Sequence, residues 1–132
     1  MIKLQEIKAG DVVMVEFDGQ LIDGEVTEVS RGDKKVQVAH GEQEFWYDIG
    51  SLHPVPITEE QLLKFDFERV DDTGNGQAQL YVKGPFSVKI LNNNNDMVLA
   101  YRDEERLLHD TVYVHQLQNH YKGMTNYELT RT

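Results

Sequence analysis

The sequence has no cysteine, only three prolines and no long apolar run. Without cysteine there are no disulfide bonds and no thiolate metal sites, which fits a reducing compartment, so we expect a cytoplasmic protein. No apolar stretch approaches the roughly 18 residues that a membrane-spanning helix needs. Residues 1–6 also lack the apolar core of a secretory signal, and we expect no membrane association.

Positive charge is scarce as well. The chain carries 13 Lys and Arg against 23 Asp and Glu, which gives a net charge of −10. Residues 1–57 hold 5 basic and 11 acidic residues (net −6), and residues 58–132 hold 8 and 12 (net −4), so both halves are acidic. Proteins that grip nucleic acid gain affinity by replacing counterions with Lys and Arg. The charge balance therefore argues against a nucleic-acid partner.

The motifs of common catalytic sites are missing too. The sequence has no Gly-x-Ser-x-Gly segment, no Gly-rich phosphate loop and no His-Glu-x-x-His. His115 and His120 are five positions apart, whereas two ligands on one helical face need a spacing of about three or four. We expect a non-enzymatic chain with no cofactor and no metal, and an unrecognised enzyme is the third hypothesis for its function.

Residues 11–56, by contrast, are rich in strand and turn signals. Apolar residues alternate from Val13 to Phe17, which predicts a strand with one buried face. Asp18-Gly19 is a strong hairpin turn, and Gly24 suggests a bulge or bend inside the next strand. The predicted strands are 13–17, 20–29, 35–39 and 44–49, with a short fifth at 51–55 after one helical turn. The predicted inward side chains are Val13, Val15, Val26, Val36 and Val38.

The rest of the chain predicts a second, β-rich part with two short helices. Thr58 and Gln61 form the sequence pattern of a capping box, which starts a helix near 58–66. A last helix near 111–122 is expected to be capped by Asp110 or Thr111 and ended by Gly123. The predicted strands here are 78–82, 86–90, 97–102 and 106–109, separated by turns at 71–76, 84–85 and 92–95. The predicted fold class is mainly β, with a small N-terminal barrel at 1–56, whose strands in residues 11–56 form an antiparallel barrel, and a β-rich C-terminal part with two short helices at 57–132.

Two kinds of resemblance follow from these segments. Residues 57–67 resemble a "PLTEEWLLKFGF" segment and residues 113–129 resemble "YVHQLQNLYFALTGEEL", both of which recur in small prophage- or mobile-element-associated proteins of Bacteroidetes. That family has no known activity, so no functional residue carries over. Asp66 stands where those proteins often have Gly, and Gly123-Met124 replaces a more apolar pair. Separately, Gly10-Asp11-Val-Val, Gly24-Glu-Val and Leu52-His-Pro-Val look similar to Tudor, KOW-like and SH3-like barrels.

The candidate binding site is a run of aromatic residues in the fourth strand. Alternation puts Trp46 on one face and Phe45 and Tyr47 on the other, with Phe17 near a neighbouring turn. An aromatic groove or cage flanked by Asp48 would favour a cationic guest. Three alternatives stay open: Trp46 is a core or rim residue of the barrel, the C-terminal part covers this face, or the module is associated with nucleic acid. We expect a protein-binding or assembly module whose partner is another protein or a second copy of the chain.

Overall fold

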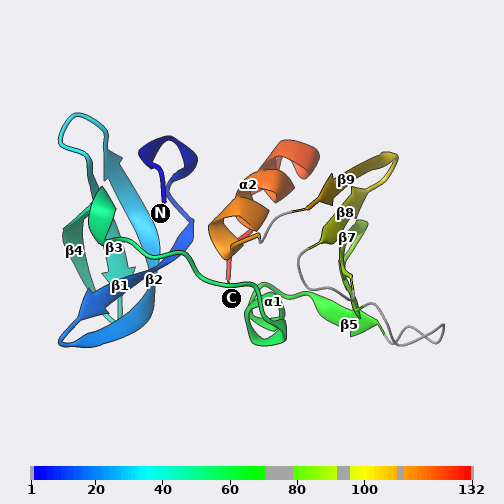
Figure 1. Ribbon diagram of the computed structural model, residues 1–132, viewed down its shortest axis with the longest axis horizontal. Helices are drawn as coiled ribbons and strands as arrows, with labels where there is room; N and C mark the ends of the chain where they lie inside the picture. The colour runs from blue at the N-terminus through cyan, green and yellow to red at the C-terminus, as the bar shows by residue number, and fades with distance from the viewer. Residues whose placement is uncertain (1, 71–78, 92–95, 110–111, 132) are drawn as a thin grey trace.

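The computed structural model describes residues 2–70, 79–91, 96–109 and 112–131, and this part of the chain is mainly β (Figure 1). It contains two antiparallel sheets of four and five strands, two α-helices and two short 3-10 turns. The N-terminal elements are η1 (Leu4–Glu6), β1 (Val12–Phe17), β2 (Gln20–Ser30), β3 (Lys35–His40), β4 (Gln43–Asp48) and η2 (Ile49–Ser51). The others are α1 (Glu59–Lys64), β5 (Glu68–Val70), β6 (Gln79–Lys83), β7 (Phe86–Ile90), β8 (Met97–Tyr101), β9 (Glu104–Leu108) and α2 (Val114–Thr125).

The N-terminal sheet follows the predicted pattern closely. Its strand order is β1-β2-β3-β4, and the five valines predicted to face inward are all at most 1% exposed. Asp18 and Gly19 both have positive φ angles, as a type I′ hairpin turn requires. Of the bulge or bend predicted at Gly24, the bulge is wrong, because the register of β2 shifts between Val26 and Glu28 instead. A Cβ at Gly24 would overlap the side chain of Val38, so glycine is needed there for close approach between strands.

The prediction of an antiparallel barrel over residues 11–56 is confirmed only in part, because the described residues form a four-stranded antiparallel sheet and not a closed barrel. The predicted fifth strand at 51–55 is wrong in extent, since only His53 pairs with β1, through two 2.8 Å hydrogen bonds to Met14. The helical turn expected before it is present as η2. The sheet is nevertheless strongly curled, because the ring centroids of Phe17 on β1 and Phe45 on β4 lie 5.3 Å apart although these strands occupy opposite edges of the ladder.

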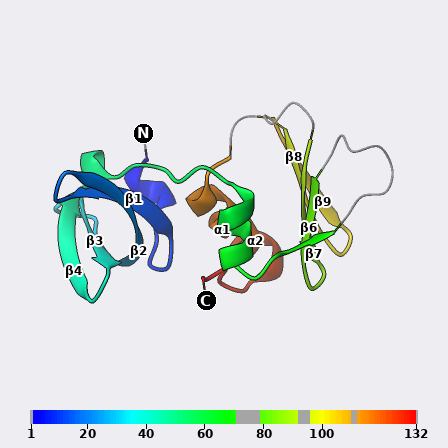
Figure 2. The same cartoon turned by 90° about the horizontal axis from the view of Figure 1, so that it is seen from below.

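The second sheet has the strand order β5-β6-β7-β8-β9 and packs one face against the helices. Figures 1 and 2 show α1 and α2 on the same side of it, between the two sheets. The strand β5 was missed in the sequence, and the predicted turns at 71–76 and 92–95 lie outside the described residues. The α2 helix begins after Tyr113 rather than at the predicted cap, whose residues are also not described, and Gly123 lies inside the helix, which ends instead at Asn126 in the left-handed region.

Side-chain and main-chain hydrogen bonds hold both ends of α1. The Thr58 hydroxyl accepts from Gln61 N at 3.2 Å, as predicted, but the Gln61 side chain donates to Asp23 of β2 and not back to the cap. At the other end Asp66 N donates to the Leu63 carbonyl and Phe67 N donates to the Leu62 carbonyl. This pairing is the Schellman motif, in which the residue at the position of Asp66 takes a left-handed conformation, and its φ is +69°.

The position of Asp66 yields a stability prediction. An L-residue at positive φ is strained relative to glycine, and the resembling segments often have Gly here. We expect Asp66→Gly to leave the free energy of unfolding unchanged or to raise it by up to about 1 kcal/mol, despite the loss of a 3.8 Å ion pair with Lys83. Asp66→Ala is the control and should destabilise by about 1 kcal/mol, because Ala keeps the strain and loses the ion pair. Urea unfolding measures both, and an order with Ala more stable than Gly would contradict the argument.

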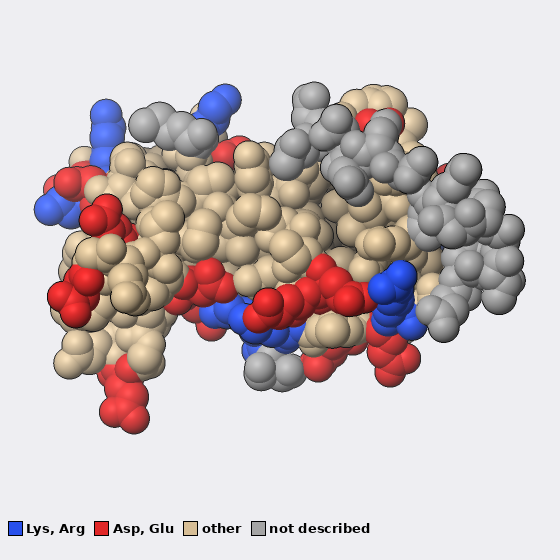
Figure 3. All heavy atoms as spheres, turned by 60° about the horizontal axis from the view of Figure 1, so that its bottom comes forward, with Lys and Arg blue, Asp and Glu red and all other residues tan. Residues whose placement is uncertain are grey.

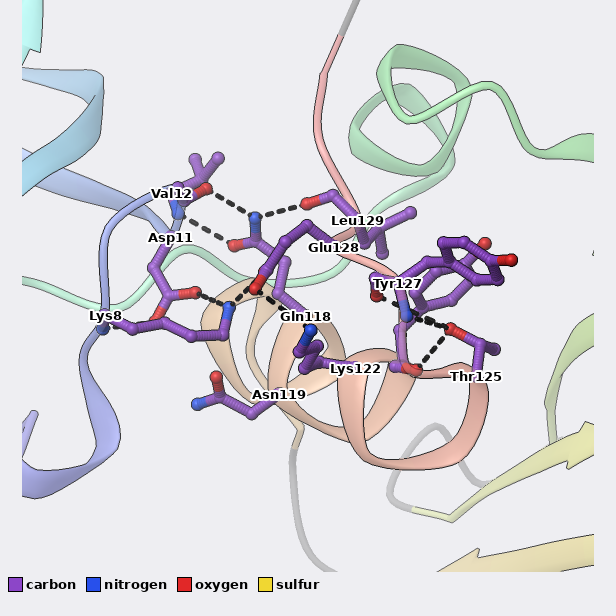
Figure 4. A network of polar contacts seen from close by, with 12 residues as sticks. Lys8, Asp11, Val12, Gln118, Asn119, Lys122, Thr125, Tyr127, Glu128 and Leu129 are labelled. Atoms are coloured by element: carbon purple, nitrogen blue, oxygen red, sulfur yellow. Dashed lines mark hydrogen bonds and ion pairs between the residues drawn. The ribbon is translucent and has the colours of Figure 1, made fainter.

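A buried glutamine of α2 joins the start of β1 to the C-terminal segment (Figure 4). The amide of Gln118 on α2 makes three hydrogen bonds, accepting from Val12 N at 2.8 Å and donating to the Gly10 and Leu129 carbonyls at 2.8 and 2.9 Å. The side chain is fully buried. Val12 itself belongs to the core shared by the helices and the second sheet, not to the core under β2 and β3. The first residues of β1 are therefore packed and hydrogen-bonded as part of the C-terminal core.

Charged groups lie beside this glutamine. Lys8 Nζ is 2.8 Å from the fully buried Asp11 carboxylate and 3.1 Å from that of Glu128. Burial raises the pKa of the Asp11 carboxyl to about 6, even though the hydrogen bonds and charge of Lys8 act in the opposite direction. The ion pairs thus connect the segment before β1 with the C-terminal segment on the surface side of Gln118.

Candidate functional site

Strand ends bring four rings together at one end of the N-terminal sheet. Phe17 is the last residue of β1 and His40 the last residue of β3, while Phe45 and Tyr47 lie on β4. The ring of Phe17 is 4.7 Å from that of His40 and 5.3 Å from that of Phe45, and the His40 and Phe45 rings stack at 5.1 Å. His40 Nε2 and the Tyr47 hydroxyl are hydrogen-bonded at 2.8 Å. We call these four residues the aromatic cluster.

The alternation of the strands explains why these side chains meet. Phe45 pairs with Val38 and Tyr47 pairs with Val36, so both point to the same face as the buried valines. His40 is two residues beyond Val38 and lies on that face too. The aromatic cluster thus lies at the outer end of the core formed by the valines of the N-terminal sheet. Phe17 is 41% exposed there.

The other two predicted site residues lie on the opposite face of β4. Trp46 pairs with Gln37 and Asp48 pairs with Lys35. Trp46 is 45% exposed, so of the alternative that made it a core or rim residue, the core position is wrong. The structure therefore brings Phe17, Phe45 and Tyr47 together and leaves Trp46 and Asp48 apart from them. His40 was not among the predicted site residues, although the alternation from Val36 through Val38 places it on the same face.

A hollow of about 370 Å³ lies beside the aromatic cluster. It is lined by Glu16, Asp18, Gly19, Tyr47, Ser51 and His53. Glu16 and Asp18 are exposed and make no ion pair with any residue that the structure describes. Burial raises the pKa of the Tyr47 hydroxyl, so the phenol stays neutral at physiological pH. Of the aromatic cluster only Tyr47 lines the hollow, and one aromatic ring beside two carboxylates is a chemical environment suited to a cation.

The protein families, curated proteins and solved structures compared with the chain give no match. The resemblance of residues 54–129 to mobile-element proteins therefore stays a prediction, and any functional argument depends on the geometry of the site. Neither α1 nor α2, nor any other described helix, is long and apolar enough to cross a bilayer. Among the described residues, no three His, Asp or Glu side chains are placed to hold a metal ion.

A second hollow, of about 660 Å³, lies between η1, β9 and α2. It is lined by Glu6, Arg106, Leu107, Leu108, His109, Val112, Gln116, Asn119 and His120. The guanidinium of Arg106 in this hollow already has two partners. It donates to the Glu104 carboxylate at 2.8 Å and lies 3.0 Å from His120 Nδ1. Burial and the nearby Arg106 lower the pKa of His120, which is therefore neutral at physiological pH. This hollow is lined by no Phe, Tyr or Trp ring, and its arginine already has partners, so the aromatic cluster is the stronger candidate.

Proposed function

We propose that this chain is a non-enzymatic protein-binding or assembly module that receives a basic side chain of a partner protein at the aromatic cluster. The observation that carries the proposal is the exposed edge of the cluster beside the hollow that Glu16 and Asp18 line. The resemblance of residues 57–67 and 113–129 supports a role in a prophage or mobile element, and the lack of cysteine supports a cytoplasmic location.

We further infer that residues 1–56 are a Tudor- or SH3-like barrel that has lost most of its closing strand. Three features support the inference: the curled four-stranded sheet, the 3-10 turn after β4, and the His53–Met14 pairing that joins the segment after η2 back to β1. In small barrels of this kind the ligand commonly lies against strand ends and their turns, which is an argument from fold analogy. The aromatic cluster occupies that position, at the β1–β2 and β3–β4 turns.

Electrostatics favour a cationic partner over a nucleic acid. Residues 1–57 carry a net charge of −6, and two carboxylates border the hollow. Figure 3 shows acidic side chains along the face it draws, while the basic ones lie apart from one another and do not form a continuous patch. A phosphate backbone needs such a patch, whereas a Lys or Arg side chain needs one aromatic face and a nearby negative charge.

A peptide titration tests this function. The probes are short peptides with a central lysine, trimethyllysine or glutamate, added to isotope-labelled protein and followed by NMR chemical shifts. We expect the two cationic peptides to shift the resonances of Phe17, Tyr47 and Gly19, and the glutamate peptide to shift none of them. Because a partly exposed cation–π contact is worth about 0.5–1 kcal/mol, Phe17→Ala and Tyr47→Ala should each weaken binding roughly two- to fivefold.

Trp46→Ala is the matched control for these variants. It removes an equally exposed aromatic ring from the other face of β4 and should leave peptide binding unchanged. Equal losses in Trp46→Ala and Phe17→Ala would refute the assignment of the site to the aromatic cluster, and binding of the glutamate peptide would refute its preference for cations.

A further inference from the structure

His40 contacts every other member of the aromatic cluster. Its ring centroid lies 4.7 Å from that of Phe17, 5.1 Å from that of Phe45 and 6.1 Å from that of Tyr47. The side chain is half-buried at the end of β3. Histidine is the residue type whose charge ordinarily changes near neutral pH. The cluster that is proposed to receive a cation therefore contains a side chain that can itself become one.

The hydrogen bond between His40 and Tyr47 can run in either direction. His40 Nε2 and the Tyr47 hydroxyl oxygen lie 2.8 Å apart. A neutral imidazole accepts at one of its nitrogens, and a phenol O–H is a better donor than a neutral imidazole N–H, so the favoured arrangement has Tyr47 donating to Nε2. The lone pairs of the hydroxyl oxygen are then free to accept from a ligand in the hollow that Tyr47 lines.

Protonation of His40 reverses this bond. Both nitrogens of an imidazolium carry a hydrogen, so Nε2 must donate, and the hydroxyl hydrogen of Tyr47 must turn away from His40. A positive charge then stands beside the Tyr47 oxygen and uses one of its lone pairs. The imidazolium also takes the rings of Phe17 and Phe45 as cation–π partners, since both centroids lie within about 6 Å. Each of these changes disfavours a second cation at the site.

Few charged groups surround the His40 ring. The inward side chains next to it on β2 and β3, Ile22, Val26 and Val38, carry no charge. The titratable groups that border the cluster on the other elements are the Tyr47 hydroxyl, Glu16, Asp18, His53 and, on the adjoining turn, Glu42. Within the described ranges of the chain, none of them forms an ion pair with His40. A proton on His40 thus introduces a positive charge that no carboxylate contacts.

We propose that His40 is a proton-sensitive positioning residue of the cation site. Neutral His40 keeps the oxygen of Tyr47 available to the partner's ammonium, whereas protonated His40 occupies the aromatic rings and releases the partner. This inference rests on the proposed function, because it describes the regulation of the same site. Linkage is reciprocal, so binding of the cation also displaces the proton from His40.

The NMR peptide titration, repeated from about pH 8 to about pH 5.5, tests this regulation. The probe is a histidine-free peptide with a central lysine and blocked ends, whose charge is constant in this range. We expect the wild-type affinity to fall about five- to tenfold, because two like charges at a partly buried site repel by more than the thermal energy. In His40→Gln an amide takes the place of Nε2 but does not titrate, so the affinity should change less than about twofold. Far-UV circular dichroism checks that each protein is folded at each pH.

His53→Gln is the matched control, because His53 is an exposed histidine that lines the same hollow. It should keep the full loss of affinity seen in the wild type. Asp11 and His115, whose pKa values burial also shifts, are present in every variant and cannot cause a difference between them.

Three results would overturn the role of His40: a wild-type affinity that does not depend on pH, a loss that persists in His40→Gln, or a loss that disappears in His53→Gln. Binding that is independent of pH refutes this inference and leaves the proposed function standing. A wild type that binds no cationic peptide even at pH 8 refutes both.

Discussion

Replacing Val38 with aspartate is expected to unfold the N-terminal sheet. Val38 is fully buried on β3 between Val26 of β2 and Phe45 of β4. A carboxylate in that position has no cation near it, and burying an unpaired charge costs several kcal/mol or more. This loss is comparable with the whole stability of a typical domain, about 5–15 kcal/mol. Urea unfolding followed by circular dichroism should show no folded baseline at neutral pH.

The matched control is Gln37→Asp, one residue away on the opposite face of β3. Gln37 is half-buried and accepts a hydrogen bond from Thr27 at 3.1 Å. An aspartate there stays in contact with water, so we expect a cost of about 1 kcal/mol or less. If Val38→Asp unfolds cooperatively with a midpoint near that of the wild type, then β3 does not have the inward face described above.

The second large effect is expected at Gln118. Leucine has a similar volume but no polar atoms, so Gln118→Leu leaves Val12 N–H and two carbonyls without partners. Each unsatisfied buried group costs about 1–3 kcal/mol. We therefore expect a loss of roughly 3 kcal/mol or more in the free energy of unfolding, measured by urea denaturation. Gln20→Leu is the control, because Gln20 is exposed, and it should change stability by less than about 0.5 kcal/mol.

Gln118→Glu separates the hydrogen bonds from the packing. A carboxylate can still accept from Val12 N–H, but its second oxygen faces the Gly10 and Leu129 carbonyls, which are acceptors. Burial raises the pKa of such a carboxyl, so the folded state holds its proton at a higher pH than the unfolded state does. Relative to the wild type, this variant should be less destabilised at pH 4 than at pH 7. A difference that does not depend on pH would show that the amide donors are unimportant.

Some elements were predictable because their signals are local. The alternating valines of β1 and β3, the Asp18-Gly19 turn and the Thr58 cap depend on residues close in sequence, and all three were predicted correctly. The strand β5 was missed because its three residues, Glu68–Val70, carry no apolar alternation. Gly24 was recognised as special, but its sequence context cannot distinguish a bulge from a close approach to Val38, which is a tertiary contact.

The candidate site was predictable only in part for the same reason. Alternation separates Trp46 from Phe45 and Tyr47, and the structure agrees. Alternation does not reveal that the sheet curls enough to bring Phe17 from the opposite edge to Phe45, nor that His40 contacts both of these rings. Nothing in the sequence indicated that Gln118 is buried and hydrogen-bonded to the main chain, since a glutamine in an amphipathic helix normally faces solvent. Its role depends on main-chain groups 106 and 108 positions earlier in the chain.

That long separation has a consequence for synthesis on the ribosome. All strand pairings of the first sheet lie within residues 12–48, so the sheet has its local partners long before the chain is finished. Val12 N–H and the Gly10 carbonyl, however, have no partner until Gln118 has left the exit tunnel. Because contacts between distant residues form late and carry a large loop-closure cost, the start of β1 pairs with β2 early while the groups that bond Gln118 wait for it. The nascent chain thus exposes the apolar side chain of Val12 until α2 has been made.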